Sequence, residues 1–265
     1  MIFDTHVHYN DRSFDEDREQ VLTGLAEKGV GAAAVVGASL ADSVSAAALA
    51  EAWPFLYASA GVHPDETSEP EALGEEAALG QLEALLARPK VLAVGEIGLD
   101  YFGYDRYPDK PDKALQQKWF ALQLRLARRL DKPVLIHSRD AAADTLELMQ
   151  REGGAAFSAV IHCFSYEWEM AKRFLDLGYY LGVGGVVTYK NGRKLKEVAA
   201  AMPLDRLLLE TDGPYLAPSP LRGSRNDSGN LPLVVQEIAR LKGISPEEVE
   251  QVSWENARRF YRLER

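Results

Sequence analysis

The sequence lacks several features that mark whole classes of protein. Its 265 residues include a single cysteine, Cys163, which excludes an internal disulfide and fits a reducing, cytoplasmic setting. No apolar run approaches the roughly 18 residues that a membrane span requires, so no membrane partner is expected. The chain opens with MIFDTHVHY, where no basic segment precedes an apolar core, and this argues against a secretory signal.

Positive charge is also scarce. Lysine and arginine supply 30 side chains against 40 from aspartate and glutamate, and the net charge at pH 7 is -10. A polyanion therefore meets long-range repulsion unless a metal ion or a local basic patch reverses the sign of the field. This argues against a protein that clamps long duplex DNA by broad phosphate neutralisation. It leaves open an enzyme that grips a strand end at a cationic site.

Short apolar runs typical of strands alternate with helix-like segments along the chain. The runs are MIFDTHVH, GAAAVVGAS, FLYASAGVH, KVLAVGEIGLD, KPVLIHS, SAVIHCFS, GYYLGVGGVV and RLLLETD. Such alternation favours right-handed βαβ units and a parallel sheet. Eight units fit an α/β fold of the (β/α)8 TIM barrel type, at its typical size of about 250 residues. An open doubly wound sheet is the alternative. No linker or low-complexity tract divides residues 1–265, so a single barrel domain is expected.

Several helices are predicted with some precision. Residues 111–132, PDKALQQKWFALQLRLARRLDK, carry apolar residues at three- and four-residue spacing, and the Ala-rich stretch 41–52 is also helix-like. Two extra C-terminal helices, near 232–242 and 245–260, follow a polar loop after the eighth run. Ser245 before Pro246 is a good N-cap with proline in the first helical position.

Polar residues with metal-binding chemistry gather where the strand-like runs end. All five histidines are among them, and the full set is His6, His8, His63, Glu96, His137, His162 and Asp212. Barrel enzymes carry their chemistry at the C-terminal ends of the strands, so these side chains are expected to converge. Each alone has a plainer explanation: a lone histidine is usually structural, Glu96 could pair with an arginine, and Asp212 could cap a turn. Seven together favour a metal site.

The spacing suggests how ions could be held. His6 and His8 are two residues apart, so both side chains point to one face of a strand and can share an ion. The carboxylate of Glu96 can bridge two ions, and His137 and His162 come from adjacent strands that could converge on a second one. Asp212 can ligate a metal, activate its bound water, or do both.

Longer motifs identify a family. DTHVHYN, GVHP, GEIGLDY, IHSRDA, HCFS and LLLETDGPYLAP appear in this order between residues 4 and 218. The chain thereby resembles the TatD family of metal-dependent deoxyribonucleases, within the amidohydrolase superfamily. The resemblance implies a barrel with two metal ions. His6, His8, Glu96 and Asp212 would hold one, and Glu96, His137 and His162 the other.

Three places depart from the family pattern. Tyr9-Asn10 stands where Leu-Asp is usual, Tyr166 replaces a glycine after HCFS, and Ser224 replaces a lysine in the late RGSRN loop. These changes leave the metal ligands intact and concern the choice of substrate. One cation that contacts phosphate is missing at Ser224.

Other residues are candidates for substrate contact. Arg139 should share the face of His137 and bring a guanidinium to a phosphate, unless it pairs with Asp140 or Asp144. His63 is a better substrate contact than a metal ligand, although a structural role is equally open. The loop after the eighth run, where barrels often bind phosphate, adds Arg222, Arg225 and Asn226.

Two further features lie close to these candidates. An aromatic group after the fourth run could stack on bases or simply pack on the barrel; it comprises Tyr101, Phe102, Tyr104 and Tyr107. Cys163 should point away from His162 on the pleat, as plain packing.

The sequence is therefore interpreted as a hydrolase that uses two divalent cations (Zn, Mn, Mg or Co) to cleave a phosphodiester. The expected substrate is single-stranded DNA trimmed from an end, with Asp212 and Glu96 catalytic and Asp212 accepting the proton of the attacking water. The same site on an ester or amide, as in D-aminoacyl-tRNA deacylation or lactone hydrolysis, is the alternative. A non-catalytic metal-binding protein is disfavoured, because the predicted ligands leave open positions for water. No oligomeric partner is implied, and a monomer is compatible with the sequence.

Overall fold

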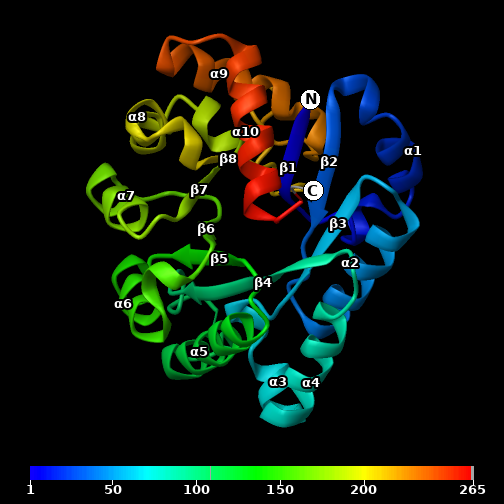
Figure 1. The fold of residues 1–265 in the computed structure, drawn as a ribbon, viewed down its shortest axis with the longest axis vertical. Coiled ribbons are helices and arrows are strands. Elements are labelled where there is room, and N and C mark those ends of the chain that lie inside the picture. Colours follow the sequence, from blue (N-terminus) through cyan, green and yellow to red (C-terminus); the bar gives the residue numbers. More distant parts are fainter. Residues whose placement is uncertain (108, 264–265) are drawn as a thin grey trace.

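The computed structural model describes residues 1–107 and 109–263. Eight parallel strands lie in the sheet in the same order as in the sequence. They are β1 Ile2–Val7, β2 Val30–Val35, β3 Leu56–Ala60, β4 Val91–Asp100, β5 Val134–Arg139, β6 Ala159–Ile161, β7 Tyr180–Val183 and β8 Leu207–Leu209. Helices surround the strands (Figure 1). The predicted (β/α)8 barrel is confirmed.

The helices among the described residues follow the strands in turn. They are α1 Arg18–Thr23, α2 Leu40–Ala52, α3 Ser68–Leu73, α4 Glu75–Leu86, α5 Lys113–Arg129, α6 Ala142–Glu152, α7 Trp168–Leu175, α8 Arg193–Ala201, α9 Leu231–Lys242 and α10 Pro246–Phe260. The predicted helices within 41–52, 111–132, 232–242 and 245–260 are confirmed by α2, α5, α9 and α10. The Ser245 hydroxyl accepts a hydrogen bond from the Glu248 N–H at 3.1 Å, as an N-cap should. None of the described helices is both long and apolar enough to span a bilayer.

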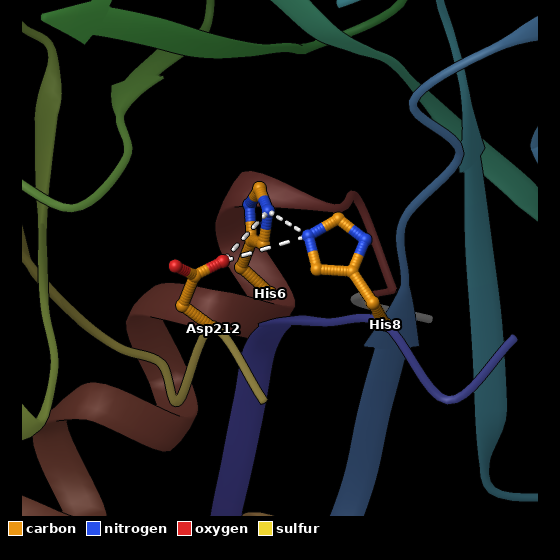
Figure 2. A group of neighbouring side chains, drawn as sticks. All are labelled: His6, His8 and Asp212. Carbon is orange, nitrogen blue, oxygen red and sulfur yellow. Dashed lines mark hydrogen bonds and ion pairs between the residues drawn. The ribbon is translucent and has the colours of Figure 1, made fainter. Parts of the chain in front are cut away.

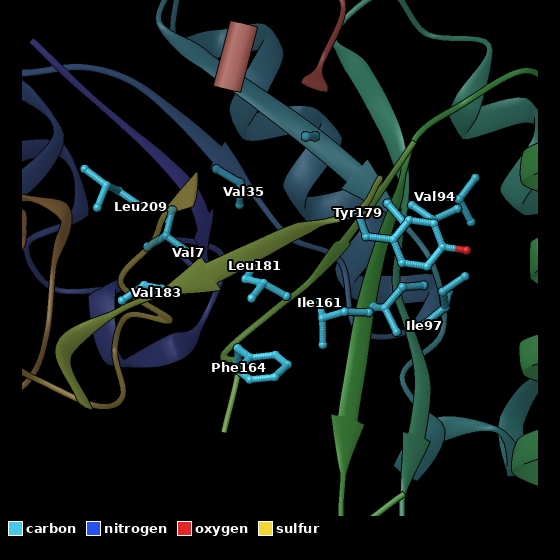
Figure 3. Close-up of a cluster of buried hydrophobic side chains, with 14 of the residues drawn as sticks. Val7, Val35, Val94, Ile97, Ile161, Phe164, Tyr179, Leu181, Val183 and Leu209 are labelled. Atoms are coloured by element: carbon cyan, nitrogen blue, oxygen red, sulfur yellow. The ribbon is translucent and has the colours of Figure 1, made fainter. Parts of the chain in front are cut away.

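The strands bury apolar side chains on both faces. One face packs against the helices, and Figure 3 shows Val35, Ile161 and Leu209 in this layer. Side chains alternate along a strand, so Val160 and Leu208 lie on the opposite face and fill the barrel interior. Full burial of one such side chain contributes about 1.5–3 kcal/mol.

The last helix closes the interior from below. Phe260, at the end of α10, and Tyr261 belong to the same buried cluster as Val160 and Leu208. The Tyr261 hydroxyl donates to the carbonyl oxygen of Thr5 at 2.8 Å. By strand alternation, His162 lies above Val160 on the inner face. The polar residues at the strand ends therefore lie directly above the packed apolar interior of the barrel.

The barrel closes between β1 and the segment that follows β8. β8 ends at Leu209, and an isolated parallel bridge joins Val7 to Gly213. The Asp212 N–H donates to the His6 carbonyl oxygen at 2.9 Å, and the His8 N–H donates to the Gly213 carbonyl oxygen at 2.7 Å. We call this set of contacts, between residues 6–8 and 212–213, the seam. The seam brings the first and the last of the predicted metal-binding motifs together.

Candidate metal centre

The two histidines of the first strand meet at one point. His6 lies in β1 with 1% of its surface exposed, and His8 follows directly after the strand. Their Nε2 atoms are 3.3 Å apart, as the two-residue spacing predicts. His8 is oriented by its Nδ1, which lies 3.2 Å from the carbonyl oxygen of Val36. Because two N–H groups cannot face each other at this distance, the pair presents at least one lone pair to a shared point.

Asp212 reaches the same point from the other side of the seam. Its Oδ1 is 3.5 Å from His8 Nε2 and 3.9 Å from His6 Nε2 (Figure 2). The backbone of Asp212 has a φ of 57°, in the left-handed region that aspartate and asparagine adopt more readily than most residues. This conformation turns the carboxylate toward the two imidazoles.

Glu96 occupies the middle of the site. Only 4% of its surface is exposed, and its two oxygens face different partners. Oε2 is 3.3 Å from His6 Nε2, whereas Oε1 is 2.8 Å from His137 Nδ1 and 3.7 Å from His162 Nε2. One carboxylate therefore connects two groups of histidines, an arrangement suited to a bridging ligand.

The first group fits a divalent cation. The group comprises His6, His8, Glu96 and Asp212, and the imidazole nitrogens lie 3.3 to 3.9 Å from each other and from the carboxylate oxygens. Four tetrahedral ligands at about 2.0–2.1 Å from an ion would lie about 3.4 Å apart. Nitrogen and carboxylate donors together suit Zn, Mn or Co, and the carboxylates also suit Mg.

The second predicted set is less compact. His137 and His162 both approach Glu96 Oε1, but their ring centroids are 6.4 Å apart. In the described residues, His162 instead forms potential ligand groups with His6 and Glu96 and with Cys163 and Asp212, and His137 forms one with His63 and Asp100. The Nε2 of His137 lies 3.0 Å from Asp100 Oδ2. The division into two ligand sets remains a prediction.

The charges of the site call for cations. Burial alone would raise the pKa of Glu96, but the charges of His6 and His162 hold it well below its usual value. Burial would lower the pKa of His137, yet hydrogen bonds to Asp100 and Glu96 raise it to about 9. The pKa of His162 is raised to about 10, because the carboxylates of Glu210 and Glu96 outweigh its burial. Ionised carboxylates thus balance protons on imidazoles, and divalent cations can replace those protons.

Outer partners orient the histidines. Asp100 accepts from Lys110 Nζ at 2.7 Å as well as contacting His137, and Glu210 Oε2 lies 3.2 Å from His162 Nδ1. Carboxylates in such positions fix the orientation of histidine ligands. The sequence interpretation missed these residues. Strand alternation could have found two of them, because Asp100 is four residues after Glu96 and Glu210 is two before Asp212.

A cavity of about 270 Å³ opens onto this centre. His63 lines it, with Nε2 3.9 Å from Glu96 Oε1 and its ring against His137 at 4.3 Å between centroids. Burial and the nearby charge of His137 lower the pKa of His63 to about 4, so this ring is neutral at pH 7. The Nδ1 of His63 accepts from the Asp65 N–H at 3.2 Å. A proton on Nε2 is therefore favoured, and this N–H points into the cavity region.

Arg139 lies at the exposed end of β5. Its guanidinium stacks on the Phe102 ring at 3.8 Å, and it lines a cavity shared with His162 and Asp212. In the described part of the chain it forms no ion pair with Asp140 or Asp144, so that alternative is not realised. Its hydrogen-bond donors face a cavity beside the centre.

The aromatic group after β4 divides in two. The Tyr101 hydroxyl donates to Asp144 at 2.8 Å, and the Tyr104 hydroxyl donates to the Pro111 carbonyl oxygen at 2.9 Å. These two rings serve the packing of their own loop. Phe102 instead supports a guanidinium, and Tyr107 is 57% exposed.

The loop after β8 is arranged differently from the expectation. Asn226 is fully buried; its amide donates to the Thr211 carbonyl oxygen at 2.9 Å and accepts from Asn230 at 3.0 Å. Arg225 forms a two-pronged pair with Asp17 and is occupied within the protein. Arg222 stacks on Tyr189 at 4.5 Å. Asn226 and Arg225 therefore hold the loop in place, and we do not propose them as substrate contacts.

The departures from the family pattern have separate structural roles. Tyr9 is fully buried and donates to the Ser228 hydroxyl at 2.7 Å, and the Tyr166 hydroxyl lies 2.8 Å from that of Ser138. Ser224 donates to the Leu221 carbonyl oxygen at 2.7 Å. Of these residues only Asn10 lines the metal cavity.

The prediction for Cys163 was wrong. Its thiol lies within 4.8 Å of ligand atoms of His162 and Asp212, and it lines the cavity next to Arg139. β6 ends at Ile161 and Cys163 has a φ of 46°, so the strand alternation no longer applies at this position. Its backbone N–H donates to Glu210 Oε1 at 2.6 Å, which holds this turn.

Comparisons with known proteins show the family of this chain. The profile of the family described as TatD related DNase matches residues 3–262. YabD of Bacillus subtilis, an uncharacterized metal-dependent hydrolase, is 38% identical over 99% of this chain and 100% of its own length. A protein of Escherichia fergusonii named 3'-5' ssDNA/RNA exonuclease TatD is 34% identical over 91% of this chain and 92% of its own.

A solved structure of a TatD homologue has the same fold. The TatD homologue YjjV of Escherichia coli superimposes with a TM-score of 0.88 and 34% identity, covering 98% of each chain. The fold is thus shared along nearly the full length of both chains. The chain belongs to the TatD-related DNase family of metal-dependent hydrolases.

Proposed function

We propose that this protein hydrolyses phosphodiesters with two divalent cations and trims single-stranded DNA from an end. The observation that carries the proposal is the convergence of His6, His8, Glu96 and Asp212 at 3.3–3.9 Å, with His137 and His162 on the other oxygen of Glu96. Cations bound there would supply positive charge to the scissile phosphate and lower the pKa of water. The named exonuclease activity of the relative from Escherichia fergusonii supports the choice of bond.

The side chains have distinct tasks in this proposal. Burial favours the neutral form of Asp212, but the hydrogen bond from His8 and the charges of His162 and His6 lower its pKa, so the carboxylate is ionised and can accept a proton from attacking water. Glu96 fixes the two groups of histidines relative to each other, because each of its oxygens faces one group. The neutral His63 can donate its Nε2 proton to an oxygen of the substrate.

Arg139 forms no ion pair with any carboxylate of the described residues, so its guanidinium is available to a phosphate. A guanidinium offers two parallel donors to a phosphate, and stacking on Phe102 keeps its plane fixed. The net charge of -10 repels long polyanions from the rest of the surface. Short or end-bound strands are therefore favoured over internal duplex sites.

Metal analysis of the purified protein, followed by activity across metals, tests the proposal. We expect two divalent ions per chain and loss of activity with excess chelator, restored when Zn, Mn, Mg or Co is added back. The substrates should be an end-labelled oligonucleotide and an aminoacyl ester. Preferential turnover of the ester would shift the function to ester hydrolysis on the same site, and full activity in chelator would overturn the metal mechanism.

A further inference from the structure

The two sides of the metal cavity differ in charge. Asp11 and Asp42, from the loop after β1 and the first turn of α2, line one side. Hydrogen bonds from Ser13 outweigh partial burial and lower the pKa of Asp11, so it is ionised at pH 7. Asp42 is exposed, and its carboxylate has no ion-pair partner within residues 1–107 and 109–263. No lysine or arginine lines this cavity among the described residues.

The side toward β4 and β5 offers a different surface. A second cavity of about 380 Å³ is lined there by Phe102, Tyr107, Lys110 and Arg139, together with two aspartates. Lys110 is held between those aspartates, at 2.7 Å from Asp100 and 3.0 Å from Asp65, so its charge is neutralised locally. Arg139 has no carboxylate partner among the described residues, and it also lines the cavity that contains His162 and Asp212. A volume of this size is within the range of small-molecule sites.

These surfaces follow different strands of the barrel. The acidic side follows β1 and β2, and the side of Arg139 follows β4 and β5, with β3 between them in sheet order. A single strand carries one phosphate for each nucleotide and is gripped by cations and exposed aromatic rings. Among the described residues that line these two cavities, only Arg139, Phe102 and Tyr107 on one side combine an unpaired cation with exposed aromatic surface.

We propose that the strand is bound in one direction, with the retained part over Arg139, Phe102 and Tyr107 and the released nucleotide against Asp11 and Asp42. This inference rests on the proposed nuclease function. Its consequence is a preference at the end of the substrate: a released nucleotide that ends in a hydroxyl group is favoured over one that ends in a phosphate. A terminal phosphate would add a charge of about -1.5 to -2 next to two carboxylates.

The size of the effect follows from distance and screening. The Debye length is about 10 Å at 0.1 M salt, so carboxylates in the cavity wall act on a phosphate in the same cavity. We expect hydroxyl-ended strands to be degraded on the order of tenfold faster than phosphate-ended ones at low salt. The preference should shrink as salt is raised, because both aspartates are accessible to solvent ions.

The test compares two oligonucleotides that differ only in the terminal group. Strands labelled at either end first identify which end the enzyme attacks, and that end is then prepared with a hydroxyl or a phosphate. The ratio of the two rates is measured for the wild type, for Asp42→Asn and for Glu76→Gln. Glu76 is a matched control, since it is exposed in the first turn of α4 as Asp42 is in α2, and it lines neither cavity.

We expect Asp42→Asn to reduce the preference severalfold and Glu76→Gln to leave it unchanged. Equal rates on both strands, or a preference that Asp42→Asn does not alter, would overturn the directional binding while leaving the nuclease function in place. If the wild type cleaves no oligonucleotide with any metal, the proposed function itself fails.

A second measurement tests the retained side. The nucleotide of the retained part that is next to the scissile phosphate is prepared without its base. This change should raise KM on the order of tenfold in the wild type, because a stacked base is lost. Tyr107→Ala should show a clearly smaller effect of the same change, since its stacking surface is already absent. An unchanged sensitivity to the missing base in Tyr107→Ala would exclude this ring from the subsite.

Discussion

Replacing Asp212 by asparagine removes a negative charge and almost nothing else. The backbone at this position has a φ of 57°, which asparagine adopts as readily as aspartate. The backbone N–H still donates to the His6 carbonyl oxygen in the seam, at 2.9 Å in the wild type. The variant is therefore expected to fold normally. Any change in turnover reports on the carboxylate.

The loss of turnover should be large. Asp212 Oδ1 is 3.5 Å from His8 Nε2 and 3.7 Å from His162 Nε2, so it serves both the cation site and the reacting water in the proposed mechanism. Removal of a general base alone costs on the order of a hundredfold to ten-thousandfold in rate. Weaker cation binding adds to this loss. We expect Asp212→Asn to keep ions at His137 and His162 but to lose nearly all activity.

The assay needs a melting curve and the turnover of a short oligonucleotide at saturating metal. Asp227→Asn is the matched control: Asp227 caps a turn by accepting from the Gly229 N–H at 2.8 Å, and asparagine caps as well as aspartate. It should retain turnover. Wild-type activity in Asp212→Asn would refute the role of the carboxylate.

Three further changes have defined outcomes. Arg139→Lys should lower oligonucleotide turnover with metal content unchanged, because lysine loses the two-pronged contact; unchanged kinetics would return Arg139 to a structural role. Gly98→Ala should destabilise the fold by about 3 kcal/mol in urea unfolding, because its φ is 150° and a Cβ would overlap the backbone of β5. Gly80→Ala, in open space on α4, is the control and should be neutral or stabilising. Hydrogen bonding from Arg240 is the main cause that lowers the pKa of Glu237 to about 2, so its stabilising contribution is present above pH 4.5 and is lost as the pH falls toward 2. The melting temperature of Glu237→Gln should accordingly lie below that of the wild type at pH 7 and approach it near pH 2.

Much of the site could be predicted because one geometric rule governs it. Parallel strands that alternate with helices bring the ends of all eight strands to one side of the barrel. Residues as distant in sequence as His8 and Asp212 therefore meet at 3.5 Å. The same rule, combined with strand alternation, would also have indicated Asp100 and Glu210.

The remainder depends on contacts that no local pattern specifies. Arg225 has a side chain and a loop position that suit a phosphate contact. It nevertheless pairs with Asp17, 208 residues away in the sequence. Cys163 follows a strand of three residues and turns into a left-handed conformation, so its direction could not be read from alternation. Such outcomes depend on tertiary partners and on where a strand stops.

The seam couples the occupancy of the metal centre to the stability of the whole barrel. His8 and Asp212 supply both the hydrogen bonds that close the barrel and donor atoms of the cation site. A cation bound by both residues would link β1 to the segment that follows β8. Its binding free energy would add to the free energy of unfolding by mass action. The amide protons of His8 and Asp212 should then exchange with solvent only when the entire barrel opens. Occupancy of the centre is therefore measurable by hydrogen exchange at these two amides without any substrate.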